Sequence, residues 1–451
     1  MKIAPIVRAL NDRKMDAADL APLRESMGGS IRSRAASMLS ENRDHLQTIS
    51  SLFVVQFLTL VAGFFTQIIV ANTLGREVFG QLAFGLALGA FGQVIIRFGL
   101  DRTLVRDLIH DPEHSARLVR ASLGLRYFLT ALVALTLLLW KMAFSVSDVS
   151  WGLLFVVLGT SILSLDLQPV YDAWQKIQRH AIYYLIQKSI FFIVVWLTIY
   201  LFPGKLTIHL LGLSILGTAL LYLFLQHQWA MRHIGRVPCG KISIGEIFDL
   251  ARQNLWVWFA ALSGLFLVQF NQILLKHYMG YAELGSYAAA WQIVMVGMLF
   301  LEQIARIGRP ATARYTRPEV PSAVRNRFLI KYSVVMLLAV LPIVLIMTCF
   351  PTLLFKYVYK PEYGAASDIL PIFGIYLLVF SFGMVSSQYI LAKKKEFIYF
   401  MSVVVGGIVS ICLCGYLIPN MGKVGAAWVV LLSHGTSMLI YSVVMVRDVG
   451  K

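Results

Sequence analysis

The chain has 451 residues, of which 58% are hydrophobic and only 14% charged, and its mean hydropathy is +0.72. A soluble domain has roughly 45–50% apolar and about 25% charged residues, so this composition excludes an ordinary soluble fold. The net charge of +17 at pH 7 does not point to nucleic acid, because cationic excess in a membrane protein marks its cytoplasmic side.

In chain order, residues 1–48 are rich in Arg, Lys, Ser and acidic residues, and we expect a cytoplasmic basic extension there. Apolar runs come next, each long enough to cross a hydrocarbon core of about 30 Å as a helix. Lipid offers no partner for bare backbone groups, which favours helices. We therefore predict an all-α integral membrane protein with about twelve transmembrane helices, at residues 50–71, 81–100, 122–140, 151–172, 181–202, 206–229, 253–276, 286–308, 332–350, 367–390, 397–418 and 424–446.

Lys and Arg residues concentrate in alternate connections between these runs. With the N-terminus inside, the inner segments hold 29 of the 40 Lys and Arg residues and the outer turns hold seven. The positive-inside rule then predicts that both termini are cytoplasmic. The seven outer residues are Arg76, Lys141, Lys205, Lys276, Lys356, Lys360 and Lys423.

One corner of the chain recurs. The stretch ANTLGREVFG (71–80) joins the first two runs, KHYMGYAELG (276–285) joins the seventh and eighth, and PNMGKVGAAW (419–428) is a shorter version. Glycine ends a helix readily and lets two helix ends approach. Any tight hairpin can use two glycines, but recurrence six runs later favours two six-helix bundles, 49–229 and 253–446, with a cytoplasmic linker at 230–252 and a tail at 447–451.

The corners LGREVFG and MGYAELGSY, the segment IRFGLDRTLVRDL (96–108) and the twelve-run plan resemble the polysaccharide flippases of the multidrug/oligosaccharidyl-lipid/polysaccharide exporter superfamily. The resemblance implies two bundles forming a V around a central cavity. It also implies alternating access that moves undecaprenyl-diphosphate-linked oligosaccharide to the outer leaflet of a bacterial inner membrane for surface polysaccharide synthesis. Glycan polymerase and glycosyltransferases would be its partners.

Six charged residues are the clear cases within the predicted spans, away from the outermost two positions, and each costs at least about 2.5–3.5 kcal/mol there. The cations Arg97, Arg126, Lys188 and Arg306 are candidate ligands for the diphosphate, because their N–H groups suit phosphate oxygens. Asp166 and Glu302 are candidate charge partners or coupling groups. The alternatives are structural: Arg97 and Arg126 snorkel to the interface, Asp166 pairs with Lys188, and Glu302 pairs with Arg306 four residues on.

The amides Gln67, Asn271 and Gln272 lie in the outer halves of their spans. They are candidates for the sugar-binding part of the cavity, or they form hydrogen bonds between helices. Relatives often have an acidic residue in the seventh span, where this chain has Asn271 and Gln272. A proton or sodium ion is the candidate coupling ion, and no cofactor is expected. The four cysteines show no metal-ligand spacing, so no metal site is predicted.

Two other functions fit parts of the pattern. A cation-coupled drug antiporter of the same superfamily needs acidic residues facing the cavity, and this chain has few. A membrane glycan polymerase or ligase commonly carries a long outer loop with catalytic residues, whereas the longest outer connection here, 351–367, has one Glu and no His. The chain has no P-loop motif. We therefore expect a transporter and not an enzyme. We expect it to be monomeric, to bind membrane lipids and not to bind nucleic acid.

Overall fold

The computed structural model describes residues 21–110, 115–143, 150–233, 244–317 and 319–449. The chain divides into two compact units, Met1–Val55 and Gln56–Lys451. The first long helix, α2 (Ala21–Arg97), begins in the first unit and ends in the second. The predicted extension at 1–48 falls within the first unit, and residues 1–20 lie outside the described residues. The second unit holds the rest of α2 and the helices after it.

The described part of the chain is helical and contains no strand. After α2 the elements are α3 (Leu100–His110), α4 (Ser115–Ala143), α5 (Trp151–Ile162), η1 (Leu163–Leu165), α6 (Gln168–Ala173), α7 (Ile177–Leu201), α8 (Ile208–His233), α9 (Ile244–Val268), α10 (Phe270–Tyr315), α11 (Ser322–Cys349), α12 (Pro351–Val358), η2 (Pro361–Ile369), α13 (Leu370–Ala392) and α14 (Glu396–Val449).

Nine stretches of the described residues are long and apolar enough to cross a membrane. Three of them, of 44, 62 and 53 residues, are too long for one crossing, since a spanning helix needs about 20 residues. Each of the three contains a glycine with positive φ at one of the corners, namely Gly75 (77°), Gly280 (84°) and Gly422 (56°). Each glycine divides its stretch into two crossings, so nine stretches make twelve. The predicted twelve-helix plan is confirmed.

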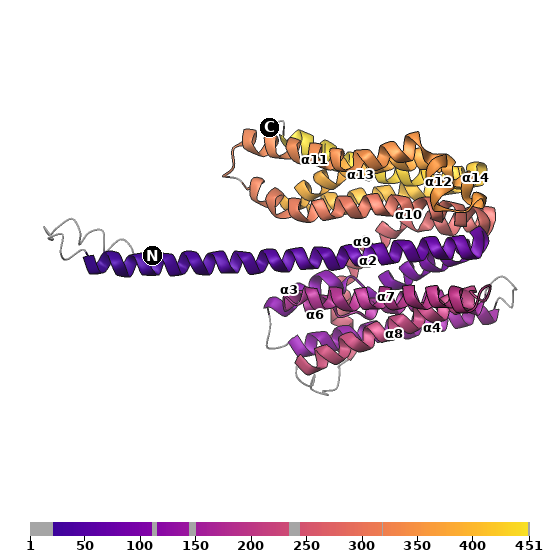
Figure 1. The fold of residues 1–451 in the computed structure, drawn as a ribbon, viewed down its shortest axis with the longest axis horizontal. Helices are drawn as coiled ribbons and strands as arrows, with labels where there is room; N and C mark the ends of the chain where they lie inside the picture. Colours follow the sequence, from indigo (N-terminus) through magenta and orange to yellow (C-terminus); the bar gives the residue numbers. More distant parts are fainter. Residues whose placement is uncertain (1–20, 111–114, 144–149, 234–243, 318, 450–451) are drawn as a thin grey trace. The chain divides into compact units, whose positions relative to one another are not determined.

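The helices form two bundles, which Figure 1 shows as a magenta group and an orange-to-yellow group. In the first bundle α8 packs on α5 and on α7. In the second bundle α13 packs on α11 and α14, and α14 also packs on α9 and α10. The predicted all-α membrane fold with two bundles is therefore confirmed.

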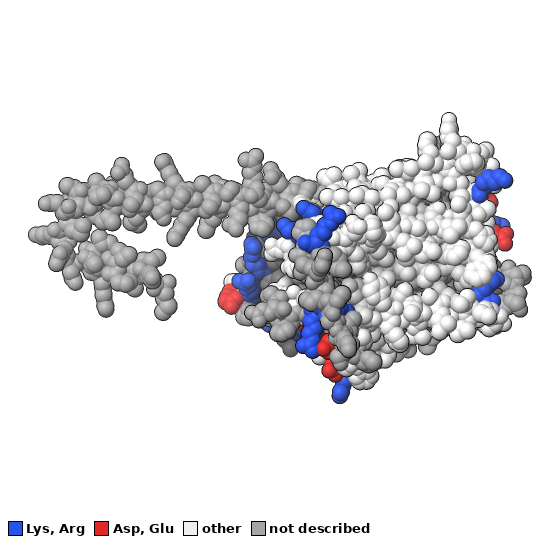
Figure 2. All heavy atoms as spheres, turned by 90° about the horizontal axis from the view of Figure 1, so that it is seen from below, with Lys and Arg blue, Asp and Glu red and all other residues white. Residues whose placement is uncertain are grey.

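Much of the outer surface is suited to lipid. Figure 2 shows a broad face without charged side chains, with Lys, Arg, Asp and Glu gathered at its two ends. Large apolar side chains are exposed along several helices, including Phe128 on α4, Trp196 on α7 and Leu338 on α11. A soluble protein rarely exposes so much contiguous apolar surface, and a bilayer covers it without cost.

Two of the glycine corners pack against each other, and we call the end of the molecule that holds them the corner end. A Cβ atom on Gly80 would lie 1.9 Å from the carbonyl oxygen of Tyr281, and one on Gly285 would lie 1.8 Å from that of Arg76. Only glycine permits this approach of two backbones. The corner of the first bundle thus docks directly on the corner of the second.

Hydrogen bonds add to this docking. The Asn72 side chain donates to the carbonyl of Val358 at 3.0 Å and accepts from the backbone N–H of Lys360 at 3.0 Å. The hydroxyl of Tyr363 donates to the carbonyl of Ala71 at 3.0 Å. The largest apolar core of the second unit continues through both bundles here, with Phe79 of α2 beside Tyr363 of η2. The bundles are therefore joined at the corner end.

Candidate functional site

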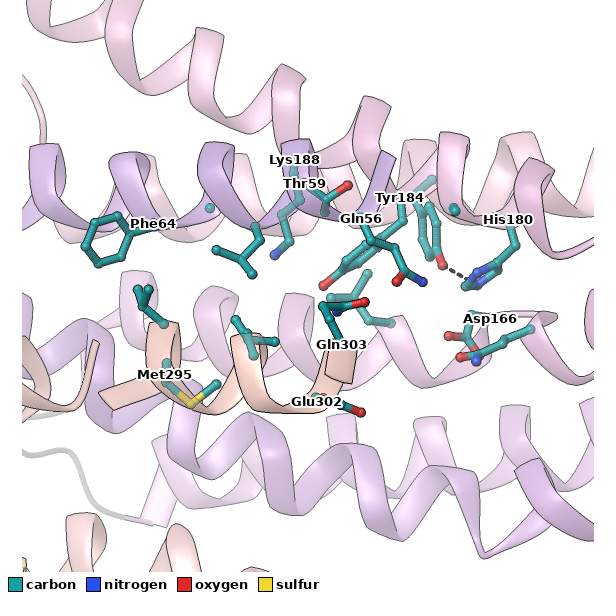
Figure 3. Close-up of a pocket in the computed structure, with 18 of the residues that line it drawn as sticks. Gln56, Thr59, Phe64, Asp166, His180, Tyr184, Lys188, Met295, Glu302 and Gln303 are labelled. Atoms are coloured by element: carbon teal, nitrogen blue, oxygen red, sulfur yellow. Dashed lines mark hydrogen bonds between the residues drawn. The ribbon is translucent and has the colours of Figure 1, made fainter. Parts of the chain in front are cut away.

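A cavity of about 580 Å³ lies between the two bundles. Its walls come from α2, the segment between α5 and α6, and helices α7, α8 and α10. Figure 3 shows polar side chains entering it from several of these helices. A polar cavity at bilayer depth is costly unless a polar occupant uses it, so it is the candidate functional site.

Three helices each present one polar face to the cavity. On α2, Gln56, Thr59 and Gln67 line the wall, and on α7 His180, Tyr184 and Lys188 do so at intervals of four residues. Residues three or four apart in a helix share one face, which explains why each set points the same way. The third face belongs to α10 and carries Gln292, Glu302, Gln303 and Arg306.

Arg97 and Asp166 lie on the cavity wall and contact each other. Arg97 Nη2 is 3.4 Å from Asp166 Oδ2, and Arg97 Nη1 is 3.3 Å from Asp101 Oδ2. Asp166 follows the 3-10 turn η1, where the helix breaks, and its ψ of 151° is not helical. The alternative that paired Asp166 with Lys188 is wrong, because the carboxylate contacts Arg97 instead.

Arg126 does not line the cavity. Its side chain is buried, with 1% of its surface exposed, and it donates to Asp101 Oδ1 at 2.8 Å and to the carbonyls of Ser164 and Asp166 at 3.1 and 3.0 Å. These bonds satisfy backbone oxygens that the break between α5 and α6 leaves without helical partners. Arg126 is therefore buried and does not snorkel to the interface, and its hydrogen bonds stabilise the broken helix.

Lys188 and Arg306 line the wall without a carboxylate partner among the described residues. Lys188 Nζ lies 5.2 Å from the centre of the Tyr184 ring, and Arg306 donates a hydrogen bond to Gln56 across the cavity. The predicted pairing of Glu302 with Arg306 is not found, since the contact of Glu302 is with Arg309, at 3.9 Å. The cavity wall therefore carries two cations whose charges are not offset by a direct ion pair.

The three predicted amides separate into two groups. Gln67 lines the cavity. Asn271 is fully buried in the second bundle and donates to the Tyr287 hydroxyl at 2.6 Å, and Gln272 donates to Gln269 at 3.0 Å. Both lie where α9 gives way to α10, and neither lines the cavity. Their contacts are hydrogen bonds within the second bundle, which was the structural alternative for these positions.

Several cavity residues were not singled out from the sequence. They include Gln56, Gln93, Gln303 and the pair His180–Tyr222, whose Nε2 and hydroxyl are 2.9 Å apart. The usable signal was the spacing of polar residues along one helix face, which places Gln56, Thr59 and Gln67 together. Among the described residues, no three His, Cys, Asp or Glu side chains gather as metal ligands.

The chain matches one family model in sequence and several known transport proteins in fold. The family model described as polysaccharide biosynthesis protein matches residues 45–308. No curated protein matches the chain by sequence. Among solved structures, lipid II flippase MurJ in an inward closed conformation has a TM-score of 0.69 at 13% identity, covering 88% of each chain.

Two structures of a multidrug resistance MATE family transporter of the MOP superfamily also match the fold. One, in an inward-facing conformation, has a TM-score of 0.67 at 14% identity, covering 87% of this chain and 94% of its own. The other, in an outward-facing conformation, has a TM-score of 0.55 at 13% identity. The match covers 89% of this chain and 94% of that chain. The fold is thus that of this superfamily.

Proposed function

The chain belongs to the polysaccharide biosynthesis protein family, and we propose that it is a flippase for a polyprenyl-diphosphate-linked oligosaccharide. The cavity would hold the diphosphate and sugars while the lipid tail stays in the bilayer. The proposed setting is a bacterial inner membrane with both termini cytoplasmic, so that the corner end faces outward.

The observation that carries this proposal is the cation-lined cavity at bilayer depth. Arg97, Lys188 and Arg306 lie on its wall against two carboxylates, Asp166 and Glu302. A bare diphosphate sugar cannot cross hydrocarbon, because its charges and hydroxyls would lose water without gaining partners. Guanidinium and ammonium groups provide partners for the diphosphate, and the amides and Tyr184 suit sugar hydroxyls and ring faces.

The contacts at the corner end suggest how transport proceeds. We infer that these contacts close the corner end, so that an occupant of the cavity would enter from the opposite, cytoplasmic end. Breaking the corner contacts while closing the opposite end would release it outward, which is alternating access. Of the two MATE transporter structures, the inward-facing one has the higher TM-score, 0.67 against 0.55, which agrees with this assignment.

The membrane potential can supply part of the energy. Moving two negative charges outward is favourable by about 4.6 kcal/mol per 100 mV, twice the single-charge value. If a proton or sodium ion is coupled to transport, Asp166 and Glu302 are the carboxylates on the wall that could bind it. The excess of cations over carboxylates makes a cation-coupled drug antiporter the weaker proposal.

The test is a flipping assay in proteoliposomes. A fluorescent disaccharide linked to farnesyl diphosphate is added, and dithionite quenching reports how much reaches the protected leaflet. Protein-dependent flipping is expected, and Arg97→Gln or Lys188→Gln should abolish it. Lys205→Gln, a change in the exposed turn after α7, is the matched control. Absence of flipping by the unmodified protein, or full flipping by both cavity variants, would reject the proposal.

A further inference from the structure

The charged cluster beside the cavity holds its two arginines in different ways. Arg126 forms three hydrogen bonds of 2.8–3.1 Å and is buried. Arg97 has a third of its side chain exposed and reaches two carboxylates at only 3.3 and 3.4 Å. A strong charge-assisted N–H···O contact is about 2.7–2.9 Å. Arg97 is therefore loosely held, and Arg126 is fixed.

Asp166 is also incompletely satisfied. Its exposed fraction is 5%, and its Oδ2 contacts Arg97. Its other oxygen, Oδ1, is buried and has no hydrogen-bond partner among the described residues, and the same holds for Arg97 Nε. Both oxygens of a buried carboxylate ordinarily accept hydrogen bonds, because a buried oxygen without a donor costs free energy. The Arg97–Asp166 pair is thus a weak one in a place where strong pairs are usual.

The backbone keeps Asp166 in place. Its carbonyl accepts from Arg126 Nη1 at 3.0 Å, and the next N–H, of Leu167, donates to Gln226 Oε1 at 2.9 Å. The carboxylate is anchored at the helix break, whereas Arg97 sits at the last turn of α2 with a long side chain. If the pair separates, Arg97 is the partner that moves.

We propose that Asp166 competes with the substrate for Arg97: the carboxylate holds Arg97 while the cavity is empty, and the anionic head group displaces it. This inference rests on the proposed function. The cluster of Arg97, Arg126, Asp101 and Asp166 has no net charge. A ligand with a single negative charge therefore gains little electrostatic binding free energy there. A diphosphate has more negative charge and more oxygen atoms than a carboxylate. It can therefore displace the Asp166 carboxylate and bind the Arg97 guanidinium. Asp166 recovers Arg97 when the substrate leaves, which favours release.

Asp166 is therefore a positioning residue that sets both affinity and selectivity. Removing its charge should tighten binding of any diphosphate lipid, since Arg97 would no longer have to be separated from an anion. Turnover should fall at the same time, because no carboxylate would then compete with the bound head group for Arg97 and favour its release. A purely structural Asp166 would behave differently: its neutralisation would lower stability and leave affinity unchanged.

The experiment measures binding of geranylgeranyl diphosphate to the purified full chain in detergent, with thermal unfolding recorded for each variant. Inorganic pyrophosphate and geranylgeraniol are titrated in parallel to separate head-group binding from lipid-tail binding. Asp166→Asn should bind the diphosphate lipid about ten-fold more tightly, which is about 1.4 kcal/mol. Asp166→Ser, a second neutral variant, should do the same, and Asp166→Glu should retain the original affinity.

Two controls make the result specific. Glu319→Gln removes an exposed carboxylate outside the cavity wall and should change affinity less than about two-fold if the effect belongs to Asp166. In an Arg97→Gln background, Asp166→Asn should give no gain, because the guanidinium that the carboxylate would have held is no longer there to be released.

The outcomes separate the two proposals. If Arg97→Gln binds the diphosphate lipid as well as the original protein does, the proposed site itself is wrong. If Arg97→Gln weakens binding but neither neutral Asp166 variant tightens it, or neither folds, only the competition is overturned. A gain that survives without Arg97, or that Glu319→Gln matches, overturns it as well.

Discussion

Gly80 and Gly285 occupy matching positions in two corners of the chain and make reciprocal contacts. Gly80 packs on the backbone carbonyl of Tyr281, and Gly285 packs on that of Arg76. A Cβ atom on either glycine would collide with the carbonyl oxygen that it faces. The two corners are six helices apart in sequence, so their mutual packing relates one bundle to the other. In the proposed transport cycle this contact is the one that must open.

Gly80→Ala should destabilise the closed corner end. The added methyl would meet a carbonyl oxygen, and overpacking of this kind costs about 1–3 kcal/mol. A cysteine at Gln67 on the cavity wall, in a background without native cysteines, should then react faster with an impermeant maleimide added from the corner side. Gly217→Ala, a helical glycine with open space around it, is the control. Equal labelling of both variants would argue against a gate at this contact.

Arg126 and Arg97 should differ in their effect on stability. Arg126→Gln leaves Asp101 and two carbonyls without a buried donor, and losing one partner of a buried pair costs about 3–5 kcal/mol. Arg97→Gln removes contacts of 3.3 and 3.4 Å made by a side chain that is one-third exposed, so it should cost less than Arg126→Gln although it leaves Asp166 without a cation. Thermal unfolding in detergent should show a larger fall in Tm for the first variant than for the second. Similar falls would contradict the distinct roles assigned to the two arginines.

Lys188→Met should weaken diphosphate binding with little change in stability. Lys188 has no carboxylate partner among the described residues, so its removal breaks no ion pair there, while a charge-assisted hydrogen bond to a phosphate is worth about 1.5–3 kcal/mol. Titration with geranylgeranyl diphosphate should show a loss of affinity of about ten-fold or more. Lys205→Met serves as the surface control. An unchanged dissociation constant would remove Lys188 from the site.

Asn271→Ala should affect the fold but not the cavity. It removes the donor to Tyr287 in the core of the second bundle and leaves that hydroxyl in an apolar setting, at a cost of about 1–3 kcal/mol. Tm should fall while the affinity for the diphosphate lipid stays within about two-fold. A selective loss of affinity with unchanged Tm would place Asn271 in the binding site after all.

The helical plan was predictable because lipid imposes a simple rule on the sequence. Uniform apolar runs such as 332–350 and 424–446 can only be helices in a bilayer, and glycine at positions 75 and 280 marks where the chain turns. That the two corners also pack on each other could not be predicted from spacing, since it depends on how the bundles meet.

The partners of the charged residues were less predictable. Asp101 lies just past the end of its predicted span and so is not among the six charges within spans, yet it contacts both Arg97 and Arg126. Depth along the helices suggests Lys188 as a partner for Asp166, but the helix break at η1 turns the carboxylate toward Arg97. Sequence position gives depth along a helix, whereas ion pairing depends on which faces meet and where a helix breaks.

The most direct test of alternating access is to lock the corner end. Asn72→Cys and Lys360→Cys, introduced together in a background without native cysteines, place two thiols where the native side chain and backbone already touch. Flipping of the fluorescent diphosphate-linked disaccharide is then measured before and after treatment with a short methanethiosulfonate cross-linker, and again after reduction. We expect cross-linking to stop flipping and reduction to restore it, with each single-cysteine variant unaffected. Undiminished flipping by the cross-linked protein would contradict the account.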